Sequence, residues 1–371
     1  MERKKFFEKI LAKLEPEVFE EKIEEIEIYK VKLKFHKTFT IATGSMDFSE
    51  NLIIILKSGN EYGIGEGYYI EEDVKNDLKL LKELKDKKFI DALEYVLKRR
   101  YTHSVRLPLS MALLDNLSRL KNIRYGDIFS ENYKNNIDTD VTIGIKSIKE
   151  TLEEFNQFTK MGFKSIKIKV GESLDKDLKK LKQIEEFAPS EIKIRIDANQ
   201  GWTPEEAREA IKKLNKMNLN LELIEQPVPK DQYEKVGELR KLTDIPIILD
   251  ESVHTADDVL KVAKYTDGVN MKPTKAGDIL EISYGYHMAS DLDLRKMIGC
   301  STESNIGITS STYIAATLGV EFVDLDSDIL QEDTLKSKVT RIEDGCRILP
   351  TEKGLGVRLD FIEFKKFEKI L

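Results

Sequence analysis

The sequence predicts an α/β protein in which a small antiparallel meander precedes a parallel β/α barrel. Three observations support this prediction. Apolar residues alternate with period two from Ile26, whereas from about residue 138 short β-branched runs alternate with amphipathic helical stretches. This strand–helix alternation occurs eight times over roughly 190 residues, as a (β/α)8 barrel requires. A length of 371 residues with 40% hydrophobic residues suits one large α/β domain with an accessory module.

Composition excludes several other classes of protein. Charged residues of both signs are interspersed and give a net charge of −7, which disfavours nucleic acid as the main partner. No apolar run reaches about 18 residues and the N-terminus lacks an apolar signal core, so we expect no membrane partner and a cytoplasmic location. Cys300 and Cys346 lie far apart without a CxxC pattern, which fits a reducing cytosol and argues against zinc. The sequence leaves open whether the chain forms a homo-oligomer.

Two units are expected before the barrel. Residues 1–22 carry apolar positions at helical spacing, interrupted at Pro16, and are predicted to form a charged helical extension. Residues 23–137 are predicted to form an α+β domain, with strands joined by a Gly59–Asn60 turn and then helices over 71–122. Its last strand is rich in glycine but precedes no helix at the spacing of a dinucleotide-binding loop. These glycines are Gly63, Gly65 and Gly67.

Residues 138–339 are predicted to form the barrel. One intervening helix begins at Thr203–Pro204, a capping residue followed by proline at the first helical position. An open, doubly wound sheet shows the same alternation and is the alternative fold. Residues 340–371 are predicted to return to the N-terminal meander. The eight expected strands are 140–145, 165–170, 192–197, 221–225, 246–250, 268–272, 295–300 and 321–326.

Ionisable residues recur at the carboxyl ends of successive expected strands. Spacings of 28, 28, 25 and 25 residues separate Lys169, Asp197, Glu225, Asp250 and Lys275. In a barrel these ends meet on one face, where active sites are built. Five consecutive units with this feature predict a functional site rather than a set of solvated loop ends.

The three acidic members of this series predict a metal site. Asp197, Glu225 and Asp250 would lie on adjacent strands, where their repulsion would protonate some of them unless a cation compensated the charge. No histidine or cysteine joins them, so only hard oxygen ligands are offered. This donor set favours Mg²⁺, or Mn²⁺, over zinc or copper.

The lysines predict acid–base chemistry. Lys167 and Lys169 alternate with apolar residues and so share one face of their strand. Because helices cover the outside of a barrel, both are expected to point inward, where carboxylates must compensate them. Lys275 would lie four strands further round, across the barrel mouth. Two lysines on opposite sides of a bound metal suit proton removal and return at the carbon α to a carboxylate.

Five segments carry a resemblance that runs from about residue 26 to the end. Their order and spacing resemble the enolase superfamily, in its muconate-lactonising subgroup. The resemblance implies a (β/α)7β barrel and an N-terminal α+β capping domain that the C-terminal tail completes. It implies Mg²⁺ ligands at Asp197, Glu225 and Asp250, and acid/base roles for Lys169 and Lys275. The segments are KIKVG (167–171), DANQGW (197–202), IEQP (224–227), DES (250–252) and NMKPTKAG (270–277).

The eighth strand narrows the expected substrate. Asp324 and Asp326 stand two apart, so both would face the barrel mouth and could clamp an ammonium. The pair is similar to that of dipeptide epimerases, where it holds the free α-ammonium of the dipeptide. The resemblance therefore implies Mg²⁺-dependent epimerisation at the α-carbon of the second residue, by 1,1-proton transfer between Lys169 and Lys275 through an enediolate.

Other reactions on the same scaffold stay open. These are N-acylamino acid racemisation, o-succinylbenzoate synthesis and muconate cycloisomerisation, whose substrates lack the free amine. A Mg²⁺-dependent binding protein without catalysis is the alternative from another class, but binding alone needs no base on each face.

Further contacts with the substrate are expected from position. They are Thr142 on the first strand, Lys167, Asn199 beyond Asp197, and Cys300 and Thr302 on the seventh strand. Glu303 matches a family acid at the end of that strand.

The loop over residues 39–51 resembles the specificity loop of the family. In members acting on L-Ala-D/L-Glu, an arginine in this loop often pairs with the glutamate side chain. Residues 41–46 hold no cation, so we expect an apolar or uncharged second residue, while Asp47 leaves a cationic one open.

Overall fold

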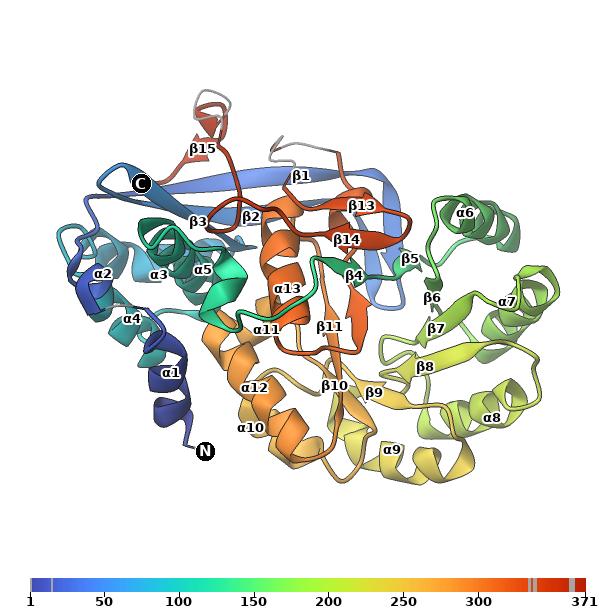
Figure 1. Cartoon of the computed structure of the whole chain (residues 1–371). Helices are drawn as coiled ribbons and strands as arrows, with labels where there is room; N and C mark the ends of the chain where they lie inside the picture. The colour runs from blue at the N-terminus through green and yellow to red at the C-terminus, as the bar shows by residue number, and fades with distance from the viewer. Residues whose placement is uncertain (1, 15, 333–334, 336–338, 360–363) are drawn as a thin grey trace.

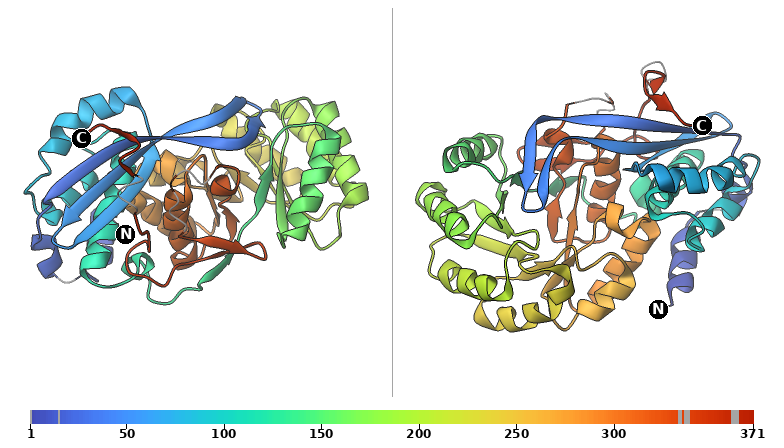
Figure 2. Two further views of the ribbon diagram at one scale, coloured as in Figure 1. Left: turned by 90° about the horizontal axis from the view of Figure 1, so that it is seen from above. Right: turned by 180° about the vertical axis from the view of Figure 1, so that it is seen from behind.

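The computed structural model describes residues 2–14, 16–332, 335, 339–359 and 364–371. Two sheets dominate the molecule, an antiparallel capping sheet and an eight-stranded parallel sheet. The long hairpin of β1 (Glu25–Ile41) and β2 (Gly44–Ser58) starts in the capping region and extends over the parallel sheet (Figures 1 and 2). No helix in the described ranges is long and apolar enough to cross a membrane.

The capping region contains the predicted meander and helices. The capping sheet is antiparallel throughout, in the order β15 (Glu368–Lys369), β1, β2 and β3 (Glu61–Tyr68), and Gly59–Asn60 forms the turn between β2 and β3. The residues predicted as a helical extension contain two short helices, with Pro16 at the start of the second. The remaining elements of this region are α1 (Arg3–Leu11), α2 (Pro16–Glu20), β3 (Glu61–Tyr68), α3 (Glu71–Lys82), α4 (Phe89–Leu97), α5 (His103–Leu120) and η1 (Tyr125–Ile128).

The glycine-rich strand β3 packs against α5. A Cβ atom on Gly65 would lie 1.9 Å from the Pro108 carbonyl oxygen, and one on Gly63 would lie 2.0 Å from the Ala112 carbonyl oxygen. Only a strand without side chains at these positions allows helix and sheet to approach this closely. The glycines thus hold α5 against the sheet.

The barrel strands follow one another in chain order around a nearly closed parallel sheet. The first and last strands meet where the Asp140 N–H donates to the Val323 carbonyl at 3.0 Å. Helices follow the first seven strands, and a 3-10 turn follows the eighth, so the fold is the expected (β/α)7β barrel. A doubly wound sheet would reverse its strand order at a switch point. That alternative is wrong.

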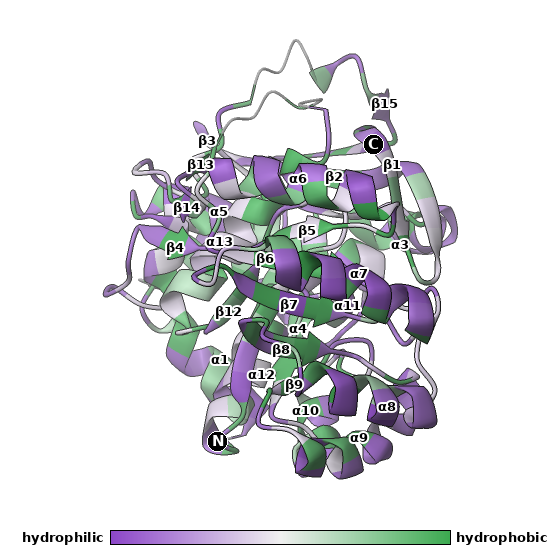
Figure 3. Ribbon diagram, turned by 90° about the vertical axis from the view of Figure 1, so that its right-hand side faces the viewer, coloured by the Kyte–Doolittle hydropathy of each residue, from purple (hydrophilic) through white to green (hydrophobic). Residues whose placement is uncertain are grey.

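All eight predicted strands are present, and each lies within its expected range. The helices between them turn mostly hydrophilic residues outward, as α7 and α8 show in Figure 3. The elements are β5 (Val141–Ile143), α6 (Ile148–Lys160), β6 (Ser165–Lys169), α7 (Leu174–Phe187), β7 (Lys193–Asp197), α8 (Pro204–Leu214), β8 (Leu221–Glu225), η2 (Lys230–Gln232), α9 (Tyr233–Leu239), η3 (Arg240–Leu242), β9 (Ile247–Leu249), α10 (Ala256–Val262), β10 (Gly268–Asn270), α11 (Pro273–Ala276), α12 (Ile279–Asp291), β11 (Arg295–Gly299), α13 (Asn305–Thr317), β12 (Phe322–Asp324) and η4 (Ser327–Ile329).

The tail differs in part from its prediction. β14 (Cys346–Ile348) pairs with β13 (Arg341–Glu343) and β4 (Asn136–Asp138) in a separate three-stranded sheet, not with the meander. Among the described residues of the tail, β15 (Glu368–Lys369) is the strand that joins β1 and completes the capping sheet. Part of the tail thus forms a local hairpin, which has the same period-two pattern as a strand of the meander.

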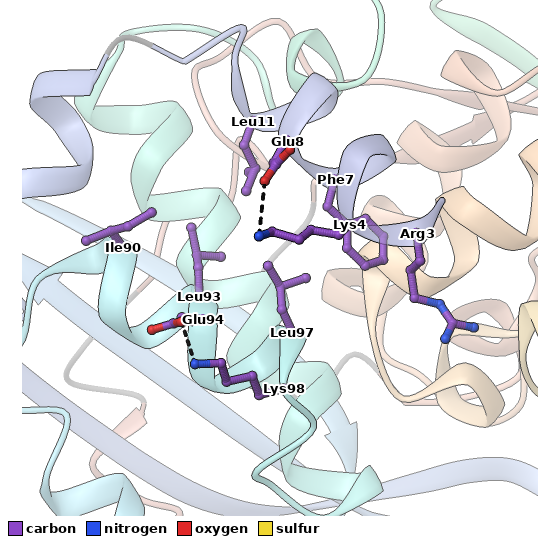
Figure 4. A pocket seen from close by; sticks show the side chains of 10 residues that line it. All are labelled: Arg3, Lys4, Phe7, Glu8, Leu11, Ile90, Leu93, Glu94, Leu97 and Lys98. Atoms are coloured by element: carbon purple, nitrogen blue, oxygen red, sulfur yellow. Dashed lines mark hydrogen bonds and ion pairs between the residues drawn. The ribbon is translucent and has the colours of Figure 1, made fainter. Parts of the chain in front are cut away.

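Helix α1 lies between the capping region and the barrel. Phe6 stacks on His287 of α12 with ring centroids 5.1 Å apart, and Arg3 donates to Glu281 at 3.1 Å. A groove lies between α1 and α4, and apolar side chains line both of its walls (Figure 4). The two contacts tie α1 to the barrel helix α12.

Candidate active site

The buried charges predicted at the strand ends do come together. Lys169 pairs in register with Asp197, and Asp197 with Glu225, so these three side chains lie at one level of the sheet. Asp250 follows directly after β9, and Asp324 closes β12. All five are at least nine-tenths buried at the same end of a parallel barrel.

Lysines neutralise these carboxylates. Lys169 Nζ lies 2.5 Å from Asp197 Oδ2, and Lys167 Nζ lies 3.3 Å from Glu225 Oε2 and also contacts Asp324. The inward direction expected for both lysines is therefore correct. Buried ions need such partners, because each unpaired one would cost several kcal/mol.

On the far side of the barrel, two more lysines meet Asp250. Lys272 Nζ lies 2.8 Å from Asp250 Oδ2. Lys275, in the single turn of α11, contacts Asp250 Oδ1 and donates to the Asn270 carbonyl at 3.0 Å. Burial, together with the like charge of Lys272, lowers the pKa of Lys275 and so favours its basic form.

The pKa values of the three predicted metal ligands diverge. Burial and the adjacent charge of Asp197 raise the pKa of Glu225 to about 7. Burial also acts to raise the pKa of Asp197 and Asp250, but the neighbouring lysines outweigh it and lower both. Three carboxylates that act on one another in this way offer the hard oxygen donors of a divalent cation, whose charge would offset their repulsion.

The carboxylate oxygens of Asp197, Glu225 and Asp250 lie less close to one another than the ligand atoms of another group of side chains do. Within the described ranges, one set of three His, Cys, Asp or Glu side chains has all its ligand atoms within 4.8 Å of one another. It consists of Cys300, Asp324 and Asp326. The carboxylates of Asp197, Glu225 and Asp250 instead each face a lysine or amide donor.

A cavity of about 190 Å³ opens beside these charges. The structure places on its wall Lys169 and every residue that was expected to contact substrate, whereas Lys275 does not line it and contacts Asp250. The expected contacts are Thr142, Lys167, Asn199, Cys300, Thr302, Asp324 and Asp326.

The two aspartates of β12 lie at one end of this cavity. The Thr142 N–H donates to Asp326 Oδ2 at 2.6 Å, and Cys300 Sγ lies 3.4 Å from Asp326 Oδ1. Although burial acts to raise it, the charges of Lys167, Lys272 and Lys169 lower the pKa of Asp324 to about 2. Asp324 is therefore an anion at neutral pH, as an ammonium site requires.

Sequence reasoning missed several cavity residues. Lys272 precedes Lys275 by three residues in the same motif, and this repeat was the available signal. Leu330 follows Asp326 by four residues, whereas Tyr68 belongs to none of the five segments and gave no signal. Phe35 and Phe39 belong to β1 and stack with centroids 6.1 Å apart.

The loop over residues 39–51 also contributes to the wall. Ile41 and Met46 line the cavity, whereas Asp47 accepts a hydrogen bond from Thr38 at 2.6 Å and does not line it. The capping region and barrel thus share the cavity, with apolar side chains mainly from the first and charged ones from the second.

Comparison with known proteins identifies the family to which this chain belongs. Residues 150–363 match the family model for enolase C-terminal domain-like proteins. The chain is 31% identical to the L-Ala-D/L-Glu epimerase of Francisella tularensis subsp. novicida, an alignment covering 90% of this chain and 99% of the relative. The chain belongs to the enolase superfamily. Within its muconate-lactonising subgroup it is an isomerase of the dipeptide epimerase family.

Solved structures of this superfamily have the same fold. The substrate-liganded L-Ala-D/L-Glu epimerase of Bacillus subtilis superposes with a TM-score of 0.85 at 26% identity, covering 91% of this chain and 98% of that one. The dipeptide epimerase of Enterococcus faecalis, complexed with Mg and L-Leu-L-Tyr, gives 0.81 at 26% identity, with 91% and 99% covered.

Proposed function

We propose that this enolase-superfamily isomerase epimerises a dipeptide at the α-carbon of its second residue. The observation that carries the proposal is the buried pair Asp324 and Asp326, which shares one cavity with Lys169. A free α-ammonium would find two carboxylates there, one of them already ionised. An acylated α-nitrogen carries no positive charge with which to use this pair.

Asp197, Glu225 and Asp250 would hold Mg²⁺. Their hard oxygen donors fit that ion, and dipeptide epimerases of this superfamily have been solved as Mg complexes. When bound, Mg²⁺ stabilises the negative charge that develops on the substrate carboxylate as the α-proton leaves.

The chain's own lysines would carry the proton. A neutral lysine on one face of the α-carbon accepts the α-proton, and the ammonium on the other face returns a proton with inversion. We assign these roles to Lys169 and Lys275. The lowered pKa of Lys275 keeps the cost of its basic form small.

The second residue of the substrate is proposed to be apolar or uncharged. Phe35, Phe39, Ile41 and Met46 give the cavity an apolar wall on the capping side. The lysines on the opposite wall are engaged by carboxylates, so they offer no unpaired cation to a glutamate side chain. A cationic second residue would lack Asp47, which points to Thr38.

Proton exchange in D₂O tests the proposal. A library of L,L-dipeptides with Mg²⁺ is followed by ¹H NMR, and we expect loss of the second residue's α-proton signal as the L,D product appears. Exchange should be fastest with apolar second residues. Exchange of an N-succinylamino acid with no exchange of any dipeptide would contradict the proposal.

The ammonium site is tested at Asp326. Asp326→Asn is the cleaner variant, because Asp324 also pairs with Lys167 and its loss would leave a buried cation. We expect kcat/KM for dipeptides to fall by roughly 10- to 100-fold, mainly through KM, as a charge-assisted contact worth about 1.5–3 kcal/mol is lost. An unchanged kcat/KM would show that the α-ammonium of the substrate does not bind at Asp326.

A further inference from the structure

The turn that carries Lys275 is short and ends at a glycine. α11 has only one turn and is closed by Gly277 in the left-handed region, with φ at 66°. The last carbonyls of a helix have no partner within the helix and need donors from outside. The last carbonyls of this turn, including that of Lys275, therefore need donors from another element.

Helix α5 of the capping region supplies those donors. His103 Nε2 donates to the carbonyl of Lys275 itself. Arg106 Nη2 donates to the Ala276 carbonyl at 3.3 Å, and its Nε donates to the Gly277 carbonyl at 3.0 Å. Because a carbonyl can only accept, His103 must carry its proton on Nε2. Three successive carbonyls of the Lys275 turn are thus bound by two side chains from one helix.

Arg106 is an uncommon residue for this task. Its side chain is buried, where a guanidinium is costly unless hydrogen-bonded, yet its bonds to the turn go to neutral carbonyls. The fit is also close in space. A Cβ on Gly277 would lie 2.5 Å from His103 Cδ2, so helix and turn are in direct contact.

The helix that presents these side chains is fixed at its start and along its length. Asp77 accepts from Thr102 N and Oγ1 at 2.6 Å, and Asp73 accepts from Ser104 Oγ at 2.7 Å. Residues 104–119 are all buried, and the glycines of β3 allow the sheet to press against them. α5 can therefore act as a rigid support.

We propose that Arg106 and His103 are positioning residues for Lys275. They hold its turn so that the ammonium stays at Asp250 and the Asn270 carbonyl, on one face of the substrate. This inference rests on the proposed two-lysine function. It predicts an asymmetry between the two lysines, because Lys169 is carried by β6 within the barrel ladder of β5 and β7.

The asymmetry is measurable because each lysine removes the proton from one epimer only. Rates of α-proton exchange in D₂O are measured separately from the L,L and L,D forms of a dipeptide that the wild type turns over. Lys169→Ala and Lys275→Ala identify which epimer depends on which lysine. The test variants are Arg106→Gln, Arg106→Lys and His103→Gln.

Arg119→Gln is the matched control. Arg119 lies on the same helix and is equally buried, but it pairs with Asp115 and donates to the Val357 carbonyl, far from the Lys275 turn. It reports what a general loosening of α5 does to both rates. Thermal melting of each variant shows whether it folds, and His103→Gln serves should Arg106→Gln not fold.

We expect Arg106→Gln to slow exchange of the Lys275-dependent epimer by on the order of 10- to 100-fold, since misplacement of a reacting group by about 1 Å has effects of this size. Exchange of the other epimer should fall by less than about threefold, and Arg106→Lys and His103→Gln should show smaller losses with the same asymmetry. Arg119→Gln should lower both rates alike.

Equal losses for both epimers in the Arg106 and His103 variants, or no loss, would overturn the assignment. Absence of exchange by the wild type with every dipeptide would instead refute the proposed function. In that event a crystal structure of Arg106→Gln decides the structural part. A Lys275 ammonium that keeps its bonds to Asp250 and Asn270 overturns the inference, and a displaced one supports it.

Discussion

At the scale of single residues, the site is a set of buried charges whose positions depend on one another. Lys167 pairs with carboxylates from three other strands, and Asp250 is held by both Lys272 and Lys275. Such contacts fix side chains that would otherwise be mobile. They also mean that removing one member leaves a neighbour unpaired, which costs about 3–5 kcal/mol for a buried pair.

A titrating residue outside this set gives a prediction about stability. Burial raises the pKa of Asp278, the N-cap of α12, to about 6. The folded state thus binds the Asp278 proton more tightly than the unfolded state does. The contribution of this proton to the free energy of unfolding is fully present below about pH 4 and is lost as the pH rises through 6. Asp278→Asn keeps the capping oxygen and removes the charge.

We expect Asp278→Asn to be more stable than the wild type by about 2 kcal/mol at pH 7–8, and the difference to vanish near pH 4. Urea unfolding at both pH values measures it. Asp231→Asn, at an exposed position, should change little at either pH. A variant that is less stable at pH 8 would show that the Asp278 carboxylate is favourable where it stands.

How far the sequence predicts the site depends on how the residues are encoded. Lys169, Asp197, Glu225 and Asp250 end strands whose spacing is regular, so periodicity alone brings them together. Tyr68 reaches the cavity through contacts between segments more than 200 residues apart, which no local pattern records. His103 and Arg106 escaped notice for the same reason, because their partners at 275–277 lie on another domain.

At the scale of elements, the close contact of β3 with α5 restricts the sequence most, because it leaves no room for a Cβ atom at Gly63 or Gly65. Gly65→Ala would place a methyl group 1.9 Å from the Pro108 carbonyl oxygen and 2.8 Å from Met111 Cβ. Backbone cannot move aside without shifting the whole helix. We expect a loss of about 3 kcal/mol, at the upper end for overpacking in a core.

Urea unfolding measures the effect of Gly65→Ala. Gly59→Asn is its control, since Gly59 has a left-handed φ of 56° that asparagine tolerates and nothing within 4 Å of a Cβ. The control should lose less than about 1 kcal/mol. A small effect of Gly65→Ala would mean that α5 is less firmly held than its burial indicates.

The same scale explains which elements the sequence predicts well. The barrel strands are buried β-branched runs bounded by turns, so each one is recognisable alone. β14 and β15 are two or three residues long, and their pairing partners are chosen by the tertiary fold. Their sheet assignments could not be read from alternation.

At the scale of the whole molecule, the capping region and barrel are joined through buried polar contacts. Glu66 of β3 accepts from Ser304 N and Gly307 N, both at 2.8 Å, and so caps the start of α13. Asn51 of β2 donates to Glu66 and to the Thr302 carbonyl. The two parts should therefore unfold together.

Mg²⁺ binding should stabilise the whole molecule against this joint unfolding. If Asp197, Glu225 and Asp250 hold Mg²⁺ in the folded state alone, Mg²⁺ at about 100 times its Kd adds about 2.7 kcal/mol of stability, and EDTA removes it. The melting temperature, followed during a Mg²⁺ titration, measures this gain. Glu225→Gln should abolish the Mg²⁺-dependent rise, whereas Asp231→Asn should retain it. A Glu225→Gln variant that still gains the full rise would place the ion elsewhere.

The long β1–β2 hairpin has a consequence for how this enzyme could change. The apolar cavity wall of Phe35, Phe39, Ile41 and Met46 comes from one continuous stretch, residues 35–46, while every acidic and basic candidate is borne by the barrel or the turns that follow its strands. The ladder from Glu25 to Lys34 anchors this stretch independently of what its tip carries. A library of variants confined to residues 35–46 would therefore change the apolar wall of the cavity while the acidic and basic side chains of the barrel stay as they are.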